Sequence, residues 1–127
     1  PDDDAWAAMI LSDVTPDMPL AKADLFVPVT SCLTVSDDED ALRQLTKCPY
    51  ALGAAVFGEV RSAANLARRI PAGCVVVNDL IAPTADPRVA FGGWNSSGFG
   101  ATRGPEGLLR MTRPRVIVEQ RGRWRPH

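Results

Sequence analysis

The sequence predicts an α/β fold with a mostly parallel sheet and helical crossovers. Apolar, β-branched runs alternate along the chain with segments of helical periodicity, which is the order that places helices between parallel strands. Cys74–Val77 is apolar without interruption, as expected of a strand covered on both faces. The 127 residues, 46% of them hydrophobic and 23% charged, are enough for one domain with a core.

The first half of the chain contains two predicted strands and a helix. Residues 7–11 form a short apolar run, and residues 27–35 are dense in β-branched side chains, so we expect a strand at each. Ser36-Asp37-Asp38-Glu39 has the pattern of a capping box and predicts a helix over residues 37–47. Pro49 ends that helix, because the residue before a proline is pushed out of the helical region.

The second half continues the alternation. Residues 52–57 predict a compact apolar strand, residues 61–70 an amphipathic helix, and Cys74–Val77 the next strand. A short helix over residues 105–111 has proline at its first turn. Residues 115–120 predict a last strand, which either returns to the sheet or projects and pairs with another subunit; we favour projection.

A glycine-rich stretch precedes the last helix. Residues 90–104 contain five glycines, two adjacent serines and the aromatic residues Phe91, Trp94 and Phe99. Glycine weakens regular elements and permits positive φ, so this stretch predicts a loop. The aromatic side chains offer apolar area to bury, which favours a functional loop over a disordered one.

Charge and cysteine usage exclude several classes of protein. A net charge of −1 gives no reason to expect nucleic acid or an anionic membrane as partner. No run approaches the roughly twenty apolar residues of a membrane span, so we expect a cytoplasmic protein. The three cysteines, Cys32, Cys48 and Cys74, have no CxxC spacing, and only His127 could join them, so we expect neither a zinc site nor a disulfide framework.

Five motifs, in this order and spacing, resemble the C-terminal region of the aldehyde dehydrogenase superfamily. They are Asp24-Leu25-Phe26-Val27-Pro28-Val29, Tyr50-Ala51-Leu52, Gly73-Cys74-Val75-Val76-Val77-Asn78, Phe91-Gly92-Gly93 and Gly107-Leu108. The resemblance covers nearly the whole chain. It implies the later part of a catalytic domain over residues 1–112 and an oligomerisation strand and tail over residues 113–127, hence a homo-oligomer. The chain begins without Met, so we also expect a piece of a longer protein.

The resemblance implies NAD or NADP as cofactor and an aldehyde as substrate. Asp24 takes the place of the family residue that accepts hydrogen bonds from the nicotinamide-side ribose, and a carboxylate can accept from both hydroxyls. Phe26 would pack near the nicotinamide, and Asn78 and Phe91 would border the substrate. Without the resemblance, Asp24 is an exposed loop carboxylate, Phe26 and Phe91 are core residues, and Asn78 ends a strand. We expect Asp24 and the glycine-rich loop to converge at one rim of a shared sheet.

The family's cysteine nucleophile lies earlier in the family's chain than the Asp24 motif. Cys32 and Cys74 fall in predicted apolar strands, where burial blunts a thiol, and Cys48 lies at the negative end of a helix. We therefore expect no catalytic residue in this chain and no turnover of aldehyde by the chain alone. Two interpretations stay open: a fragment of an NAD(P)-dependent aldehyde dehydrogenase, or a stand-alone, non-catalytic relative that acts as an oligomerisation or binding module.

Overall fold

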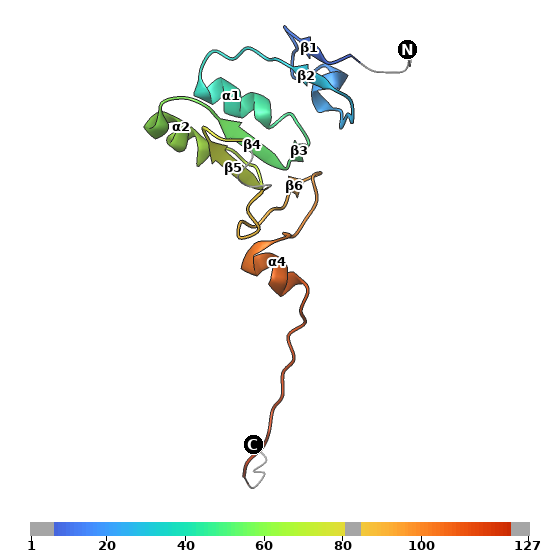
Figure 1. Ribbon diagram of the computed structural model, residues 1–127, viewed down its shortest axis with the longest axis vertical. Coiled ribbons are helices and arrows are strands. Elements are labelled where there is room, and N and C mark those ends of the chain that lie inside the picture. The colour runs from blue at the N-terminus through green and yellow to red at the C-terminus, as the bar shows by residue number, and fades with distance from the viewer. Residues whose placement is uncertain (1–6, 81–84, 123–127) are drawn as a thin grey trace.

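A computed structural model describes residues 7–80 and 85–122 of the chain and confirms the predicted α/β class (Figure 1). The described elements are β1 (Met9–Leu11), the 3-10 helix η1 (Pro19–Lys22), β2 (Val29–Ser31), α1 (Asp38–Leu45), β3 (Tyr50–Ala51), β4 (Gly53–Val56), α2 (Val60–Ala67), β5 (Cys74–Val77), β6 (Trp94–Asn95) and α4 (Gly104–Arg110). Within the described residues the strands form three two-stranded sheets, β1–β2, β3–β6 and β4–β5, instead of one continuous sheet.

The best-formed unit is β4–α2–β5, in which two parallel strands are joined by a helical crossover. The register runs from Gly53 opposite Cys74 to Val56 opposite Val77. Glu59 caps α2, because its carboxylate accepts hydrogen bonds from the amides of Arg61 at 3.0 Å and of Ser62 at 2.8 Å. These two bonds stabilise the ionised form and lower the pKa of Glu59.

The N-terminal strands β1 and β2 also pair in parallel, from Met9 opposite Val29 to Leu11 opposite Ser31. The predicted strand over residues 27–35 is therefore shorter than expected. Because β1 has only three residues, it can form hydrogen bonds with only part of the β-branched segment 27–35. The turn-rich connection between the two strands contains η1, which places a proline at its first turn.

The cap of α1 differs from the expected one by a single residue. Asp37, and not Ser36, is the N-cap: its Oδ1 accepts from the Asp40 amide at 2.8 Å, and Oδ2 of Asp40 accepts in return from the Ser36 amide at 3.1 Å. The Ser36 amide is the main cause of the lowered pKa of Asp40. Glu39 is thereby left to form an ion pair with Arg69 of the turn after α2, at 2.6 Å, which joins the two helical segments.

A pair of two-residue strands connects the middle of the chain to the glycine-rich loop. Ala51 of β3 lies opposite Trp94 of β6 in an antiparallel pair, and the Ala51 amide donates to Oγ of Ser97 at 2.9 Å. This pairing was not expected, since residues 90–104 were predicted to form a loop throughout.

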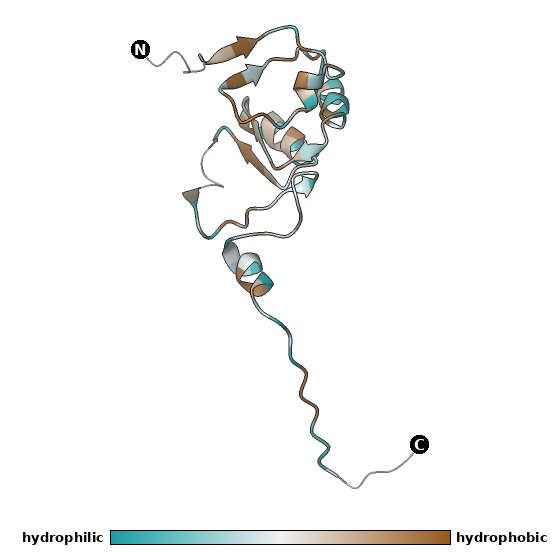
Figure 2. Cartoon of the chain, turned by 90° about the vertical axis from the view of Figure 1, so that its right-hand side faces the viewer, coloured by the Kyte–Doolittle hydropathy of each residue, from teal (hydrophilic) through white to brown (hydrophobic). Residues whose placement is uncertain are grey.

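The chain beyond α4 is extended and projects from the rest of the molecule (Figure 1, Figure 2). Residues 113–122 form no strand and are exposed, with Val116, Ile117 and Val118 at 85%, 70% and 87% exposure. The alternative in which this segment returns to the sheet is therefore wrong for the described chain. Its pairing with another subunit stays a prediction.

Few side chains of the described residues are buried. Val14, Ala51 and Ala63 are the buried apolar residues, whereas Phe26 is 95% exposed and Phe99 fully exposed. Apolar surface on this scale is typical of a face that another polypeptide segment covers. No helix among the described residues has both the length and the apolar character needed to cross a bilayer.

Candidate functional site

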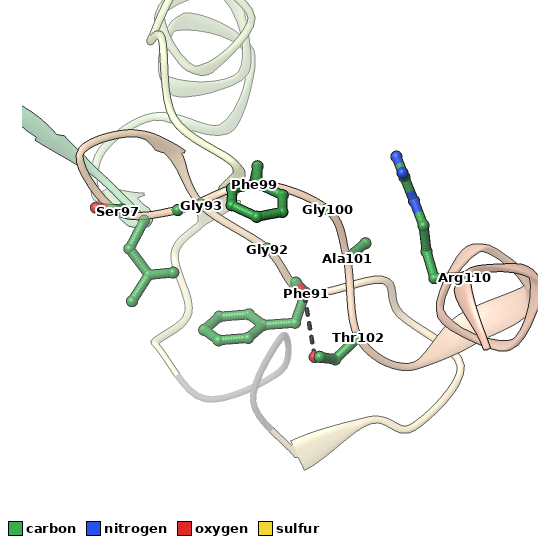
Figure 3. A pocket seen from close by; sticks show the side chains of 11 residues that line it. Phe91, Gly92, Gly93, Ser97, Phe99, Gly100, Ala101, Thr102 and Arg110 are labelled. Carbon is green, nitrogen blue, oxygen red and sulfur yellow. Dashed lines mark hydrogen bonds between the residues drawn. The ribbon is translucent and has the colours of Figure 1, made fainter.

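Hydrogen bonds between Phe91 and Thr102 close the glycine-rich loop. The Phe91 amide donates to the Thr102 carbonyl at 2.8 Å, and the Thr102 amide donates to the Phe91 carbonyl at 2.7 Å. The Thr102 hydroxyl also donates to the Phe91 carbonyl, at 3.1 Å (Figure 3). Three hydrogen bonds therefore fix the position of the Phe91 backbone relative to Thr102.

Close backbone approaches explain why glycine occupies two positions here. A Cβ on Gly92 would lie 2.2 Å from the Gly100 carbonyl oxygen, and a Cβ on Gly73 would lie 1.8 Å from the Gly92 carbonyl oxygen. Neither approach is compatible with a side chain. The two glycines thus let the loop fold tightly and lie against the start of β5.

The folded loop borders a pocket of about 470 Å³, which is the candidate site (Figure 3). Its walls combine aromatic, aliphatic, hydroxyl and cationic groups, including Leu52, Phe91, Ser97, Phe99, Thr102 and Arg110. Phe91 also lines a second pocket, of about 190 Å³, together with Cys74, Val76 and Leu80. The half-buried Phe91 therefore borders both hollows. An apolar wall with a few polar groups suits a small organic molecule.

Asp24 and Phe26 lie in the connection between η1 and β2. Both are exposed, and the Asp24 carboxylate makes no hydrogen bond or ion pair with any residue in the described part of the chain. An uncommitted acceptor beside an exposed aromatic ring fits the chemistry of a ribose and a nicotinamide, because the ribose supplies hydroxyl donors and the nicotinamide a flat face. The pair is thus chemically suited to the cofactor contact that the resemblance implies.

The expected convergence of Asp24 with the glycine-rich loop at one sheet rim is wrong for this chain. Asp24 precedes β2, which among the described strands pairs with β1 alone, whereas the loop pairs through β6 with β3. Both views place the η1–β2 connection and the loop at different heights along the long axis (Figure 1, Figure 2). The physical reason is that the sheet that would join them is divided into separate pairs.

Asn78 follows β5 and has a left-handed backbone, with φ of 54°. Its Oδ1 accepts from the Gly58 amide at 2.9 Å, and its Nδ2 donates to the Gly58 carbonyl at 3.0 Å. The side-chain amide therefore ties the end of β5 to the start of the crossover. Asn78 is not among the residues that line the two pockets beside Phe91.

The cysteines do not form a site. Cys32 is exposed, contrary to the burial we expected, because it lies just beyond β2, while Cys48 and Cys74 are partly buried. Among residues 7–80 and 85–122, no three His, Cys, Asp or Glu side chains are grouped as metal ligands would be.

Sequence reasoning missed two cations, one that lines the pocket and one that contacts the Phe91 ring. Arg110 lines it from α4, and the guanidinium carbon of Arg103 lies 5.6 Å from the centroid of the Phe91 ring. A signal existed for Arg103, since it immediately precedes Gly104-Pro105 at the start of a helix, where the backbone must turn sharply.

The chain is similar to proteins of known family. The model of the aldehyde dehydrogenase family matches residues 3–117. A succinate-semialdehyde dehydrogenase [NADP(+)] of Deinococcus radiodurans and a vanillin dehydrogenase of Corynebacterium glutamicum are each 35% identical over 109 residues, which are 85% of this chain and 22% of the relative. The chain thus spans about a fifth of the length of these curated relatives.

Solved structures of aldehyde dehydrogenases are also similar to this chain. The crystal structure of an NAD-dependent aldehyde dehydrogenase from Sinorhizobium meliloti superposes with a TM-score of 0.83 at 30% identity, covering 92% of this chain and 23% of that one. An aldehyde dehydrogenase of Mycobacterium tuberculosis complexed with NAD+ superposes with a TM-score of 0.75 at 28% identity, covering 82% of this chain and 21% of that one.

Proposed function

The chain belongs to the aldehyde dehydrogenase family, and from this premise we propose that residues 1–112 form the later part of the catalytic domain of an NAD(P)-dependent aldehyde dehydrogenase. Residues 113–127 would serve as an oligomerisation strand and tail. The reaction is oxidation of an aldehyde to a carboxylic acid. The bound dinucleotide supplies a hydride acceptor for that chemistry.

The observation that carries the proposal is the position of Phe91. A half-buried aromatic ring beside a 470 Å³ pocket, on a loop whose backbone is held by three hydrogen bonds, forms an apolar wall. Such a wall can orient the carbon chain or ring of an aldehyde and exclude water from it. The two relatives are named for different aldehydes, succinate semialdehyde and vanillin, so the proposal extends to aldehydes as a class and not to one compound.

Asp24 and Phe26 are the proposed cofactor contacts in this chain. The carboxylate would accept hydrogen bonds from ribose hydroxyls, and the ring would cover an apolar face of the nicotinamide. The exposure of both groups and the uncommitted Asp24 carboxylate support this role. The chemistry does not distinguish NAD from NADP, since both carry the same nicotinamide-side ribose.

The nucleophile is not assigned to this chain. None of the pockets that contain Phe91 combines a cysteine with a general base: Cys74 lines the smaller pocket, whose other described lining residues are apolar or glycine. We therefore propose that the chain supplies pocket wall and cofactor contacts, and that the cysteine belongs to a part of the catalytic domain outside these 127 residues.

One observation favours a second candidate function. Residues 116–118 are apolar, exposed and unpaired in the described chain, which suits a module that self-associates without catalysis. Under this candidate the protein would assemble but would bind neither NAD+ nor NADP+, so cofactor binding separates the two.

The cofactor role is tested by isothermal titration of the protein, as translated from its gene, with NAD+ and with NADP+. Asp24→Asn should weaken binding of the preferred dinucleotide by about tenfold or more, because hydrogen bonds to a charged acceptor are among the strong ones. Asp38→Asn, an equivalent change at an exposed position in the first turn of α1, is the matched control. Equal affinities of the two variants would show that Asp24 does not contact the cofactor. No binding of either dinucleotide by the unaltered protein would favour the self-associating, non-catalytic module.

A further inference from the structure

The contact between Arg103 and Phe91 carries an inference about specificity, which rests on the proposed function of Phe91 as a substrate wall. We propose that Arg103 is a positioning residue: its guanidinium holds the Phe91 ring in place and thereby determines which aldehydes the neighbouring pockets accept. The juxtaposition is a cation 5.6 Å from the ring centroid, within the range of a cation–π interaction.

The backbone around this contact is rigidly held on both sides of the ring. Thr102, the residue before Arg103, forms three hydrogen bonds with the backbone of Phe91. The Arg103 carbonyl accepts from the Gly107 amide at 2.8 Å, at the first turn of α4. The Arg103 side chain therefore starts from a fixed point and reaches a ring whose own backbone is fixed.

Arg103 adopts a backbone conformation that disfavours every residue except glycine. Its φ is 64° and its ψ is 172°, a combination in which a Cβ is strained. Glycine would fit here without strain, and the next residue, Gly104, also has a positive φ, of 61°. A side chain at this position therefore has a cost, and the contact with Phe91 is a gain that only a long side chain supplies.

The position of the ring matters because Phe91 lines both hollows of the site. The larger pocket, of about 470 Å³, and the smaller, of about 190 Å³, share Phe91 as a wall. A ring that moves toward one hollow enlarges the other. A cation that fixes the ring therefore fixes the size of each of the two pockets, and with it the width of the aldehyde that each pocket accepts.

The experiment uses the protein as translated from its gene and compares kcat/KM for acetaldehyde and benzaldehyde. Arg103→Gly relieves the strained backbone and removes the cation. We expect equal or higher thermal stability, together with a change of about tenfold in the ratio of the two kcat/KM values. Arg103→Lys retains the charge and should recover part of the ratio. Arg61→Ala, which removes an exposed cation from α2, is the control and should leave the ratio unchanged.

Two further readouts separate the contact of Arg103 with the ring from its effect on specificity. In a Phe91→Ala background, Arg103→Gly should change the ratio less than twofold, because the residue acts through the ring. With 4-fluorophenylalanine at position 91 alone, the ¹⁹F resonance should move in Arg103→Gly and not in Arg61→Ala. An unmoved resonance would overturn the positioning contact. A moved resonance with an unchanged aldehyde ratio would overturn the specificity role, and a moved resonance in a protein that oxidises no aldehyde would show that the proposed function had failed.

Discussion

Two apolar segments of similar composition differ in this molecule, since one is a paired strand and the other is exposed and unpaired in the described chain. β5 reads Cys-Val-Val-Val, pairs with β4 along its whole length and is half-buried. Residues 116–118 read Val-Ile-Val, have the same preference for extended backbone, and are exposed without a strand partner in the described chain. β-branched composition alone therefore does not make a strand, because a strand also needs a partner and a covered face.

The difference lies in what precedes each segment. β4 and α2 lie directly before β5, and a single crossover returns the chain beside β4 in parallel register. Residues 116–118 follow α4 and point away from the rest of the molecule (Figure 1). Their unpaired amides and carbonyls form an edge without a neighbour. We expect a second copy of the chain to supply that neighbour.

The largest effect should come from placing a carboxylate in β5. Val75→Asp would put a charge into a half-buried, paired strand and should reduce the free energy of unfolding by about 3 kcal/mol. Val116→Asp makes the same change in the exposed tail and should alter it by less than about 0.5 kcal/mol. Urea denaturation followed by far-UV circular dichroism measures both. Similar losses in the two variants, at a concentration at which the chain is monomeric, would mean that the tail is covered within the monomer.

A smaller loss is expected at the end of β5. Asn78→Ala removes both hydrogen bonds to Gly58. It also places an alanine, which disfavours a left-handed backbone and has no polar side chain to stabilise it, at φ of 54°. The expected cost is about 2 kcal/mol. Asn78→Gly removes the same bonds but tolerates the backbone, so it should cost about 1 kcal/mol less. The same denaturation assay decides, and a neutral Asn78→Ala would show that the amide does not stabilise the crossover.

The tail should matter for association rather than for folding. The chain should dimerise or aggregate, and Ile117→Asp should raise the dissociation constant by about tenfold, since a charge in an apolar pairing edge opposes docking. Gln120→Glu adds charge at a polar position of the same segment as a control. Sedimentation velocity at high concentration measures the oligomer. An unaltered chain that sediments as a monomer would contradict the pairing.

The smallest effect should be the acid dependence of the α2 cap. The amides of Arg61 and Ser62 lower the pKa of Glu59 from its ordinary value of 4.5. The cap therefore contributes stability above pH 4.5 that is lost as the pH falls through the lower, folded-state value. Glu59→Gln should flatten the stability profile below pH 4.5, which thermal melts across the acid range measure. Glu119→Gln, in the tail, should leave the profile as it is; an equal change in both variants would contradict the assignment to Glu59.

The elements with a strong local signal were predictable. The apolar runs that became β4 and β5, and the amphipathic segment between them, needed only periodicity and length. The cap of α1 was predicted one residue early, because Ser36 and Asp37 can both accept from a helix amide and the choice depends on Asp40 turning back to Ser36. The β3–β6 pair could not be predicted, since its two-residue strands are matched only by the fold of the intervening chain.

The candidate site was predictable in part. The resemblance to the aldehyde dehydrogenase family, and not the loop pattern alone, indicated Phe91 as a pocket residue, and Phe91 lines two pockets. Arg103 was missed because the backbone it adopts is one in which sequence rules expect glycine. The exposure of Cys32 was also missed, because it depends on where β1 stops offering partners and not on the local sequence.

Aldehyde-dependent formation of NADH or NADPH by the protein as translated from its gene tests the central claim most directly. We predict turnover of at least one aldehyde in a panel that contains acetaldehyde, benzaldehyde and succinate semialdehyde, with Phe91→Ala changing the order of preference among them. A folded protein that reduces neither dinucleotide with any aldehyde of the panel would contradict the account.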